Sequence, residues 1–434
     1  MAWKWIRHPL GSTTVLQLYD PERQRRMRMK SGWALAFVIL PLAALMSCSS
    51  STNVNTTGYV WVATSGDQKL SAFAVNLGTG ATSPVGGQVA TGAQPAAIAI
   101  TPDRKVLFVA NSSDDTVAIY TINGDQSLKP ACAGSQGCTT ATVPSGQTPV
   151  ALAVDPSGKF LFVANQGTFA DPTSGTISVF TISGTTLTQV GNPFPTEVLG
   201  DVTGSGPTGV IAAPAGNFLY VSNQFTNTVQ LFTYDPTSGA LTLPPTSYTA
   251  GTSPTGMAFS RCAGFTAATS ACTSADGNNL FVANSGSNNV SVFTACIQVS
   301  PACPSANGSL IAVPGSPFAS GITPTSLIVN PVANFVYVVD SGSNQISQNQ
   351  YNSSTGALIA LIPPDVSTSS SPGPGGITAD GSVLFVPDRG GSTMSVYTAN
   401  SVVSVSGTAP TGRLNPATTP SVSLTGQPSV LLVK

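Results

Sequence analysis

Short apolar runs separated by polar turns recur along the chain from about residue 58 to the last residue. The most regular run is an aliphatic residue, an aromatic residue, Val, one further residue, and then Asn or Asp. Its copies end at Asn111, Asn165, Asn223, Asn284, Asp340 and Asp388, and a degenerate first copy ends at Thr64. Consecutive copies end 47 to 61 residues apart. Such a period is typical of β-propellers and related repeat arrays.

Each copy has the same neighbours in the sequence. Before it comes an apolar run that begins with Pro, at 95–100, 149–154, 207–211, 254–259 and 324–329. After it comes a third run with a clearer alternation of apolar and polar residues, as in 116–120, and then a weaker fourth run, such as 240–243. Lengths of four to six residues, β-branched and aromatic residues, and Gly, Pro and Asn between the runs predict strands. Four antiparallel strands per unit, repeated radially, predict a β-propeller.

The two ends of the repeat region are complementary. Residues 427–433 read as a first strand with no second strand after it, and residues 58–62 read as a second strand with no first strand before it. Paired, they complete one blade and close a ring, which removes the open sheet edges. We therefore predict an all-β fold, a seven-bladed propeller of four-stranded antiparallel blades over residues 58–434. An open β-solenoid is the alternative, although it does not require complementary half-blades.

Residues 1–47 differ from the rest. They contain seven basic and two acidic residues, and the basic group at 23–30 directly precedes a fourteen-residue apolar run at 33–46. This run is too short to cross a bilayer comfortably. A basic segment, a short apolar segment and then small residues predict a secretory signal peptide. Since 26 residues precede Met27, translation from Met27 or Met29 would leave a signal peptide of ordinary length.

The end of the apolar run is more specific. Leu45-Met46-Ser47-Cys48 resembles a bacterial lipobox, in which cleavage before the cysteine is coupled to its lipidation. The resemblance implies an exported protein, lipid-anchored through Cys48 in the bacterial cell envelope and facing the periplasm or the surface, with 48–57 as a flexible tether. An uncleaved anchor with an incidental cysteine is the alternative.

The other six cysteines fall into three close pairs. They are Cys132 and Cys138, Cys262 and Cys272, and Cys296 and Cys303. Sequence alone does not define their connectivity. Close spacing within polar stretches favours three local disulfides in an oxidising compartment. A zinc site would require CxxC spacing and usually His.

Composition narrows the chemistry. Charged residues make up 8% of the chain, against about 25% in an average domain, and after residue 47 nine basic residues face fifteen acidic ones. This balance argues against a nucleic-acid partner. The only histidine, His8, precedes the expected cleavage site, which leaves the exported chain without a Ser-His-Asp triad or a His-ligated metal. We expect a monomer with no cofactor and no metal.

The candidate site residues lie at equivalent positions of the repeat. Asn111, Asn165, Asn223, Asn284, Asp340 and Asp388 end their strands on the face where propellers commonly bind ligands. The structural alternative is that Asn and Asp end strands by bonding their own backbone. Arg389 could hold an anionic group in a bidentate manner, and Glu197 and Asp201 could form an acid–base pair in a long connection on the same face.

The repeat resembles a known family. Leu107-Phe-Val-Ala-Asn111 followed by Thr116-Val-Ala-Ile-Tyr120 looks like the YVTN repeat, and residues 58–434 are similar to seven-bladed lactonase-type propellers that include 6-phosphogluconolactonase relatives. The resemblance implies either an envelope-anchored module that binds a protein, peptide or glycan, or a hydrolase of a sugar lactone. Lactonases of this family are associated with Glu, Arg and His in the central channel. A third reading is a rigid surface spacer.

Overall fold

The computed structural model divides the chain into two units, Met1–Val54 and Asn55–Lys434. It describes residues 2–3, 18–19, 57–131, 141–167, 175–196, 205–242, 245–261, 278–401 and 410–434. In the first unit, β1 (Ala2–Trp3) pairs antiparallel with β2 (Leu18–Tyr19). The signal peptide, Met27, Met29 and Cys48 lie outside the described residues, so those assignments stay predictions.

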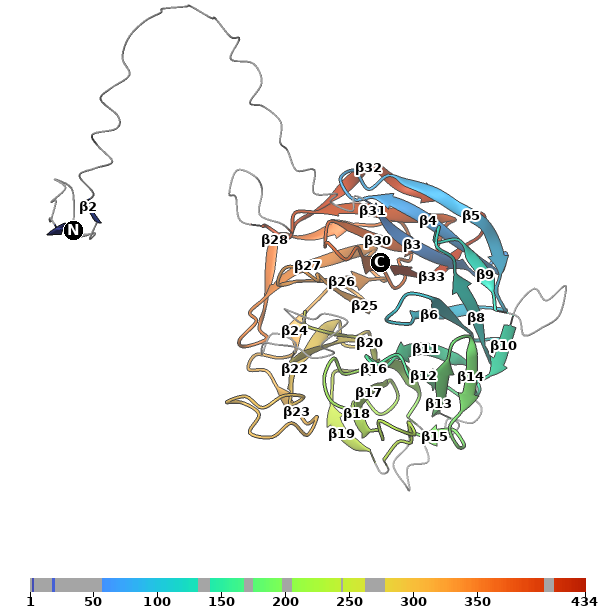
Figure 1. Ribbon diagram of the computed structural model, residues 1–434, viewed down its shortest axis with the longest axis horizontal. Coiled ribbons are helices and arrows are strands. Elements are labelled where there is room, and N and C mark those ends of the chain that lie inside the picture. The colour runs from blue at the N-terminus through green and yellow to red at the C-terminus, as the bar shows by residue number, and fades with distance from the viewer. Residues whose placement is uncertain are drawn as a thin grey trace, which may run out of the picture. The chain divides into compact units, whose positions relative to one another are not determined.

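The second unit consists of seven antiparallel sheets arranged around a common centre (Figure 1). The first sheet contains β6 (Pro95–Ile100), β7 (Val106–Asn111), β8 (Thr116–Ile122), β9 (Leu128–Pro130) and β10 (Ala141–Pro144). The second contains β11 (Pro149–Val154), β12 (Phe160–Asn165), β13 (Thr176–Ser183), β14 (Thr186–Gln189) and β15 (Phe194–Pro195). The third contains β16 (Pro207–Ala212), β17 (Phe218–Asn223), β18 (Thr228–Thr233) and β19 (Thr246–Thr249).

The remaining sheets continue in chain order. The fourth contains β20 (Pro254–Phe259), β21 (Asn279–Asn284), β22 (Asn289–Ala295), β23 (Leu310–Ala312) and β24 (Phe318–Ala319). The fifth contains β25 (Pro324–Val329), β26 (Phe335–Asp340), β27 (Gln345–Tyr351) and β28 (Leu358–Ser367). The sixth contains β29 (Gly376–Ile377), β30 (Val383–Asp388), β31 (Thr393–Ala399) and β32 (Leu414–Ser423).

The seventh sheet joins the two ends of the propeller. It contains β33 (Pro428–Val433), β3 (Thr57–Thr64), β4 (Lys69–Asn76) and β5 (Thr82–Ala90). The register runs from Val60 opposite Val433 to Thr64 opposite Pro428. The predicted seven-bladed propeller and its closure by the N- and C-terminal strands are confirmed.

The predicted strands are confirmed most closely in the inner part of each blade. All six residues of β7 are buried, as are all six of β12, β17, β21, β26 and β30. This burial explains why the sequence run that forms each second strand is almost continuously apolar, since these strands are covered on both faces. The expected alternation of the third strand is wrong: β8 buries four consecutive residues, because neighbouring blades pack on both of its sides.

The outer strands depart further from the prediction. In the third blade, the described part of the run expected at 240–243, residues 240–242, forms an isolated bridge from Leu241 to Tyr234, and β19 is the strand that pairs with β18. In the first, second and fourth blades the outer edge is divided between two short strands. Little apolar surface is buried at these edges, so the sequence pattern defines them poorly.

The apolar core is divided among seven clusters, each between two adjacent blades. Trp61 and Leu70 of the seventh blade pack with Leu107 and Tyr120 of the first, for example. The other clusters continue this arrangement around the ring. Each interface therefore has its own small core, which is how one long chain segment forms a single domain.

Strand direction gives the propeller two distinct faces. Because neighbouring strands are antiparallel, the loops that follow second and fourth strands lie on one face, which we call the upper face. The loops that follow first and third strands lie on the opposite, lower face. None of the described residues is helical, and within them no segment qualifies as a membrane-spanning helix.

One of the three predicted disulfides lies among the described residues. Cys296 and Cys303 are bonded, with their Cα atoms 5.1 Å apart, so this local pairing is confirmed. Cys132, Cys138, Cys262 and Cys272 lie outside the described residues, and their pairing stays a prediction.

Candidate functional site

The predicted polar ring lies at the upper ends of the second strands. Its members are Asn111, Asn165, Asn223, Asn284, Asp340 and Asp388, and each has 0% of its surface exposed. Thr64 takes the equivalent place in the seventh blade and is 1% exposed. The ring residues therefore lie beneath the upper-face loops.

Three amide members of the ring, Asn111, Asn165 and Asn284, connect the second strand to the third. Asn165 Nδ2 donates to Thr176 Oγ1 at 3.1 Å and to Ser178 Oγ at 2.9 Å. Asn284 Nδ2 donates to Asn289 Oδ1 at 2.8 Å and to Ser291 Oγ at 2.9 Å. These bonds span the loop between the two strands, and they are of the local kind that the structural alternative expects.

Asn111 adds a contact to the preceding loop. Its Nδ2 donates to Thr116 Oγ1 at 3.2 Å, and its Oδ1 accepts from the Gly92 amide at 3.1 Å. The Asn111 side chain therefore connects the loop that enters its blade with the loop that follows the second strand.

The two carboxylates of the ring are surrounded by hydroxyl donors. Asp340 accepts from Ser320 Oγ and Ser347 Oγ, each at 2.6 Å. Asp388 accepts from Thr393 Oγ1 at 2.8 Å and from Ser395 Oγ at 3.1 Å. Burial raises the pKa of both carboxyls, although the hydroxyl donors partly oppose it. Neither carboxyl reaches solvent, so neither can contact a dissolved substrate directly.

Arg389 lies next to Asp388 and is exposed. Its Nε and Nη2 donate to the main-chain oxygen of Ser429 at 3.0 and 2.9 Å. Ser429 belongs to β33, the innermost strand of the seventh blade, so the guanidinium extends from the sixth blade to the inner edge of the seventh. Arginine has five N–H donors, and these two bonds leave the others available to an anion or a carbonyl oxygen.

The family can be assigned from the sequence together with this fold. Residues 50–358 match the model of the lactonase family of seven-bladed β-propellers. The chain belongs to this family. The matched range ends before Asp388 and Arg389, so their roles are argued from geometry alone. No curated protein matches the sequence of this lactonase-family chain.

Solved structures agree on the fold. The chain is similar to a protein of Bacteroides uniformis assigned as a 6-phosphogluconolactonase, with a TM-score of 0.68 and 17% identity over 87% of this chain and 100% of that one. It is also similar to the periplasmic gluconolactonase of Pseudomonas aeruginosa, with a TM-score of 0.67 and 17% identity over 87% of this chain and 99% of that one. Identities this low relate the folds only.

Two of the predicted catalytic candidates cannot be placed in this lactonase-family propeller. Glu197 and Asp201 lie outside the described residues. The described residues on either side of this segment are in contact: Thr196 Oγ1 is hydrogen-bonded to Ser205 Oγ, and both side chains are buried. The location of Glu197 and Asp201 on the upper face stays a prediction.

Hydroxyls of the third strand are the site feature that we did not predict. Ser178, Ser291, Ser347 and Ser395 each occupy the third residue of a third strand and bond a ring residue. In the third blade this position is Gln230, and among the described residues the side-chain nitrogen and oxygen of Asn223 have no partner. The signal was present in the sequence as a Ser two residues after a polar strand start.

Because the ring side chains are buried, they are not directly accessible for the predicted ligand binding. A ligand on the upper face would meet the loops and Arg389 before any ring side chain. Ligand binding by the ring members stays a prediction. The side-chain contacts of five members establish a structural function, since they fix the loops on which an upper-face site would be built; these members are Asn111, Asn165, Asn284, Asp340 and Asp388.

Proposed function

We propose that the chain hydrolyses a sugar lactone on the upper face of the propeller. Two observations support this proposal: the chain belongs to the lactonase family, and one protein of similar fold is a periplasmic gluconolactonase. The geometric feature on which the proposal depends is Arg389, an exposed cation that the Ser429 main-chain oxygen holds at the inner edge of the ring.

The chemistry assigns a role to each candidate. Water attacks the lactone carbonyl carbon, negative charge develops on the carbonyl oxygen, and the ring C–O bond then breaks to give a hydroxy acid. The free donors of Arg389 would stabilise the developing charge. Asp388 is a positioning residue, since its bonds to Thr393 and Ser395 fix the start of the loop that begins with Arg389.

The proton transfers require a carboxyl group that reaches solvent. The mature sequence has no histidine for this step, and Asp340 and Asp388 are buried. We assign the step to Glu197 or Asp201, in the sequence segment between Thr196 and Ser205. A carboxylate there would take a proton from water and return it to the leaving alcohol.

The test is hydrolysis of gluconolactone and of its 6-phosphate by the full chain, followed by pH-stat above the spontaneous rate. We expect Arg389→Ala to lower kcat/KM by about 100-fold, the loss typical of one oxyanion donor. Arg413→Ala, which removes an exposed arginine from a lower-face loop, should leave the rate unchanged. Absence of turnover above the spontaneous rate, or full activity in Arg389→Ala, would refute the proposal.

A second candidate function is binding without catalysis. The absence of histidine from the exported chain and the buried ring favour an envelope-anchored module that binds a protein, peptide or glycan. Saturable lactone or glycan binding with no turnover would select this function over hydrolysis.

We also propose that the propeller is exported and anchored through a lipid on Cys48. The support is the lipobox-like sequence before Cys48 and the short polar segment that links it to β3. The test is fractionation of cells that produce each protein, with lactone hydrolysis measured in the membrane and soluble fractions. Wild-type protein should be recovered with the membrane fraction, and Cys48→Ser protein should not. Equal membrane association of both proteins would argue against the lipid anchor.

A further inference from the structure

The lower face contains a cavity of about 880 Å³ where the two ends of the propeller meet. Loops of the first, sixth and seventh blades line it, among them those carrying Asp103, Arg104, Lys105, Asp380 and Lys434. Arg389 lies on the opposite face, so this cavity is separate from the proposed lactonase site.

Basic residues are concentrated in this cavity. Only nine follow Cys48 in the whole sequence, and three of them, Arg104, Lys105 and Lys434, line it. In a chain with so few charges, this convergence is a distinctive feature of the lower face.

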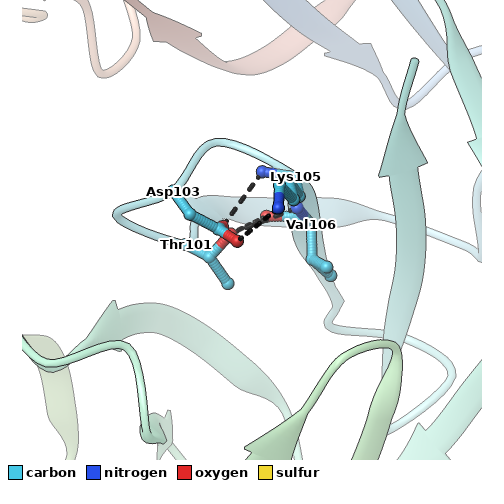
Figure 2. A network of polar contacts seen from close by, with 4 residues as sticks. All are labelled: Thr101, Asp103, Lys105 and Val106. Carbon is cyan, nitrogen blue, oxygen red and sulfur yellow. Dashed lines mark hydrogen bonds and ion pairs between the residues drawn. The ribbon is translucent and has the colours of Figure 1, made fainter. Parts of the chain in front are cut away.

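One acidic residue of the cavity is already engaged by its own turn. Asp103 accepts from Thr101 Oγ1 at 2.6 Å and from the Lys105 amide at 3.2 Å, and it pairs with Lys105 Nζ at 3.9 Å (Figure 2). Asp103 is therefore held within its own turn, and its ion pair with Lys105 is a long one between exposed side chains.

The second acidic residue is engaged in the same way. Asp380 accepts from Thr378 Oγ1 at 2.6 Å, from the Ser382 amide at 3.1 Å and from Ser382 Oγ at 2.7 Å. These bonds hold the Asp380 carboxylate against its own turn, and within the described residues it forms no ion pair with a basic residue.

Arg104 and Lys434 remain without a counter-ion. Within the described residues, neither side chain forms an ion pair. Burial and the positive charge of Arg104 both lower the pKa of the Lys434 amine. Two neighbouring cations repel each other, and an anion bound between them would offset this repulsion by attracting both.

The backbone of Arg104 is also unusual. Arg104 has φ +59°, in the left-handed region that favours glycine. Its amide bonds the Thr101 oxygen, as the Gly158 amide bonds Asp155 and the Gly381 amide bonds Thr378 in the same turn of other blades. Those blades have glycine there, at φ +73° and +71°. The first blade instead has an arginine at a position whose backbone conformation favours glycine.

We propose that this lower-face cavity binds a phosphate group between Arg104 and Lys434. A guanidinium pairs with phosphate oxygens in a bidentate manner, and an ammonium adds a point charge. With a volume of about 880 Å³, the cavity would hold a phosphate group that is part of a larger molecule.

The phosphate could belong to a soluble compound or to a membrane lipid. Thr57 lines the same cavity, and it lies nine residues after Cys48, so the link to a lipidated Cys48 is at most about 30 Å long. The lipid source depends on the proposed anchor, whereas phosphate binding itself does not.

Calorimetric titration of the full chain with inorganic phosphate and with glycerophosphoglycerol, a soluble diester headgroup, tests the proposal. We expect Arg104→Gly to weaken binding at least tenfold and to remain folded, because glycine adopts this φ freely. Arg104→Asn, which also tolerates the left-handed region, serves as a second variant. The matched control is Lys159→Ala, which removes the exposed lysine of the corresponding turn in the second blade and should change binding less than twofold.

Each outcome has a defined meaning. Tighter binding of inorganic phosphate identifies a soluble phosphate compound, and tighter binding of the diester identifies a lipid headgroup; both support the site. Absence of saturable binding of either compound, or equal binding by wild type and Arg104→Gly, overturns it. Lactone hydrolysis should be unchanged in Arg104→Gly, which separates this site from the proposed upper-face activity.

Discussion

At the scale of residues, the ring on the upper face contains an exchange of amides for carboxylates. Asn165 and Asn284 donate to third-strand hydroxyls, whereas Asp340 and Asp388 accept from hydroxyls at the same positions. Because a hydroxyl can donate or accept, both versions satisfy the third strand. The carboxylate version carries an additional cost, since burial disfavours its charged form.

This cost makes the stability of the propeller depend on pH. The pKa of Asp388 is raised in the folded state, so between the unfolded value of about 3.9 and the raised value the folded chain binds more protons. The contribution of Asp388 to stability therefore falls as pH rises through that window and is constant above it.

We expect Asp388→Asn to weaken this dependence, since Asp340 keeps its own raised pKa. The variant should be at least as stable as wild type at pH 7, as measured by urea unfolding from pH 4 to 8. Asp388→Leu should instead lower the free energy of unfolding by about 1–3 kcal/mol, because the Thr393 and Ser395 hydroxyls lose their acceptor. An unaltered pH slope in Asp388→Asn would show that this carboxyl does not titrate in the window.

The ring residues could be predicted from the sequence, but their surroundings could not. The repeated run of residues marks the end of each second strand, which is why Asn111 and Asp340 could be predicted as members of the ring. It does not specify what covers that end, since the covering Gly92 and Ser320 come from the connection that enters the blade. Arg389 was predicted as an anion ligand, but its anchor on the Ser429 carbonyl depends on ring closure.

At the scale of elements, inner strands were predictable and outer strands were not. Strands such as β7 and β12 are buried along their whole length, so each of their positions is constrained to be apolar. β5 and β28 are mostly exposed, and their sequences reflect solubility and turn geometry. The same physical difference explains why the fourth strand of the third blade was misplaced.

A covalent bond stabilises one of these weakly specified edges. Cys296 and Cys303 are buried and close a short loop before β23. Close to this loop, the hydroxyl of buried Tyr220 donates to the Gly308 oxygen at 2.6 Å and connects the third blade to it.

Replacing both cysteines with Ala should lower the free energy of unfolding by about 2 kcal/mol, the chain-entropy value for so short a loop. Hydrogen exchange should increase between residues 297 and 310 while β21 stays protected. Unchanged stability together with unchanged exchange would indicate that local hydrogen bonds alone hold this edge.

At the scale of the whole molecule, stability is shared by seven similar interfaces rather than by one centre. The seventh blade is distinctive because its inner strand comes from the other end of the chain. β33 buries Val430, Leu431 and Val433 and covers the edge of β3.

A chain that ends at Thr425 and lacks β33 should therefore lose the cooperative unfolding transition and elute as aggregates in size-exclusion chromatography. Ser429→Ala keeps β33 and removes one hydroxyl bond to the Ala63 oxygen, so it should cost less than about 1.5 kcal/mol. A monomeric truncated chain with a wild-type melting curve would mean that closure contributes little.

The pairing of β33 with β3 also sets an order of events in the cell. Val60 pairs with Val433, so nearly the entire polypeptide must leave the ribosome, and any export channel, before the seventh blade can be completed. Until then β3 keeps an unpaired edge, the kind of surface that recruits other chains. Pairing of the two ends is therefore the last step in forming the ring, and the seventh blade is the one that stays incomplete until the end of synthesis.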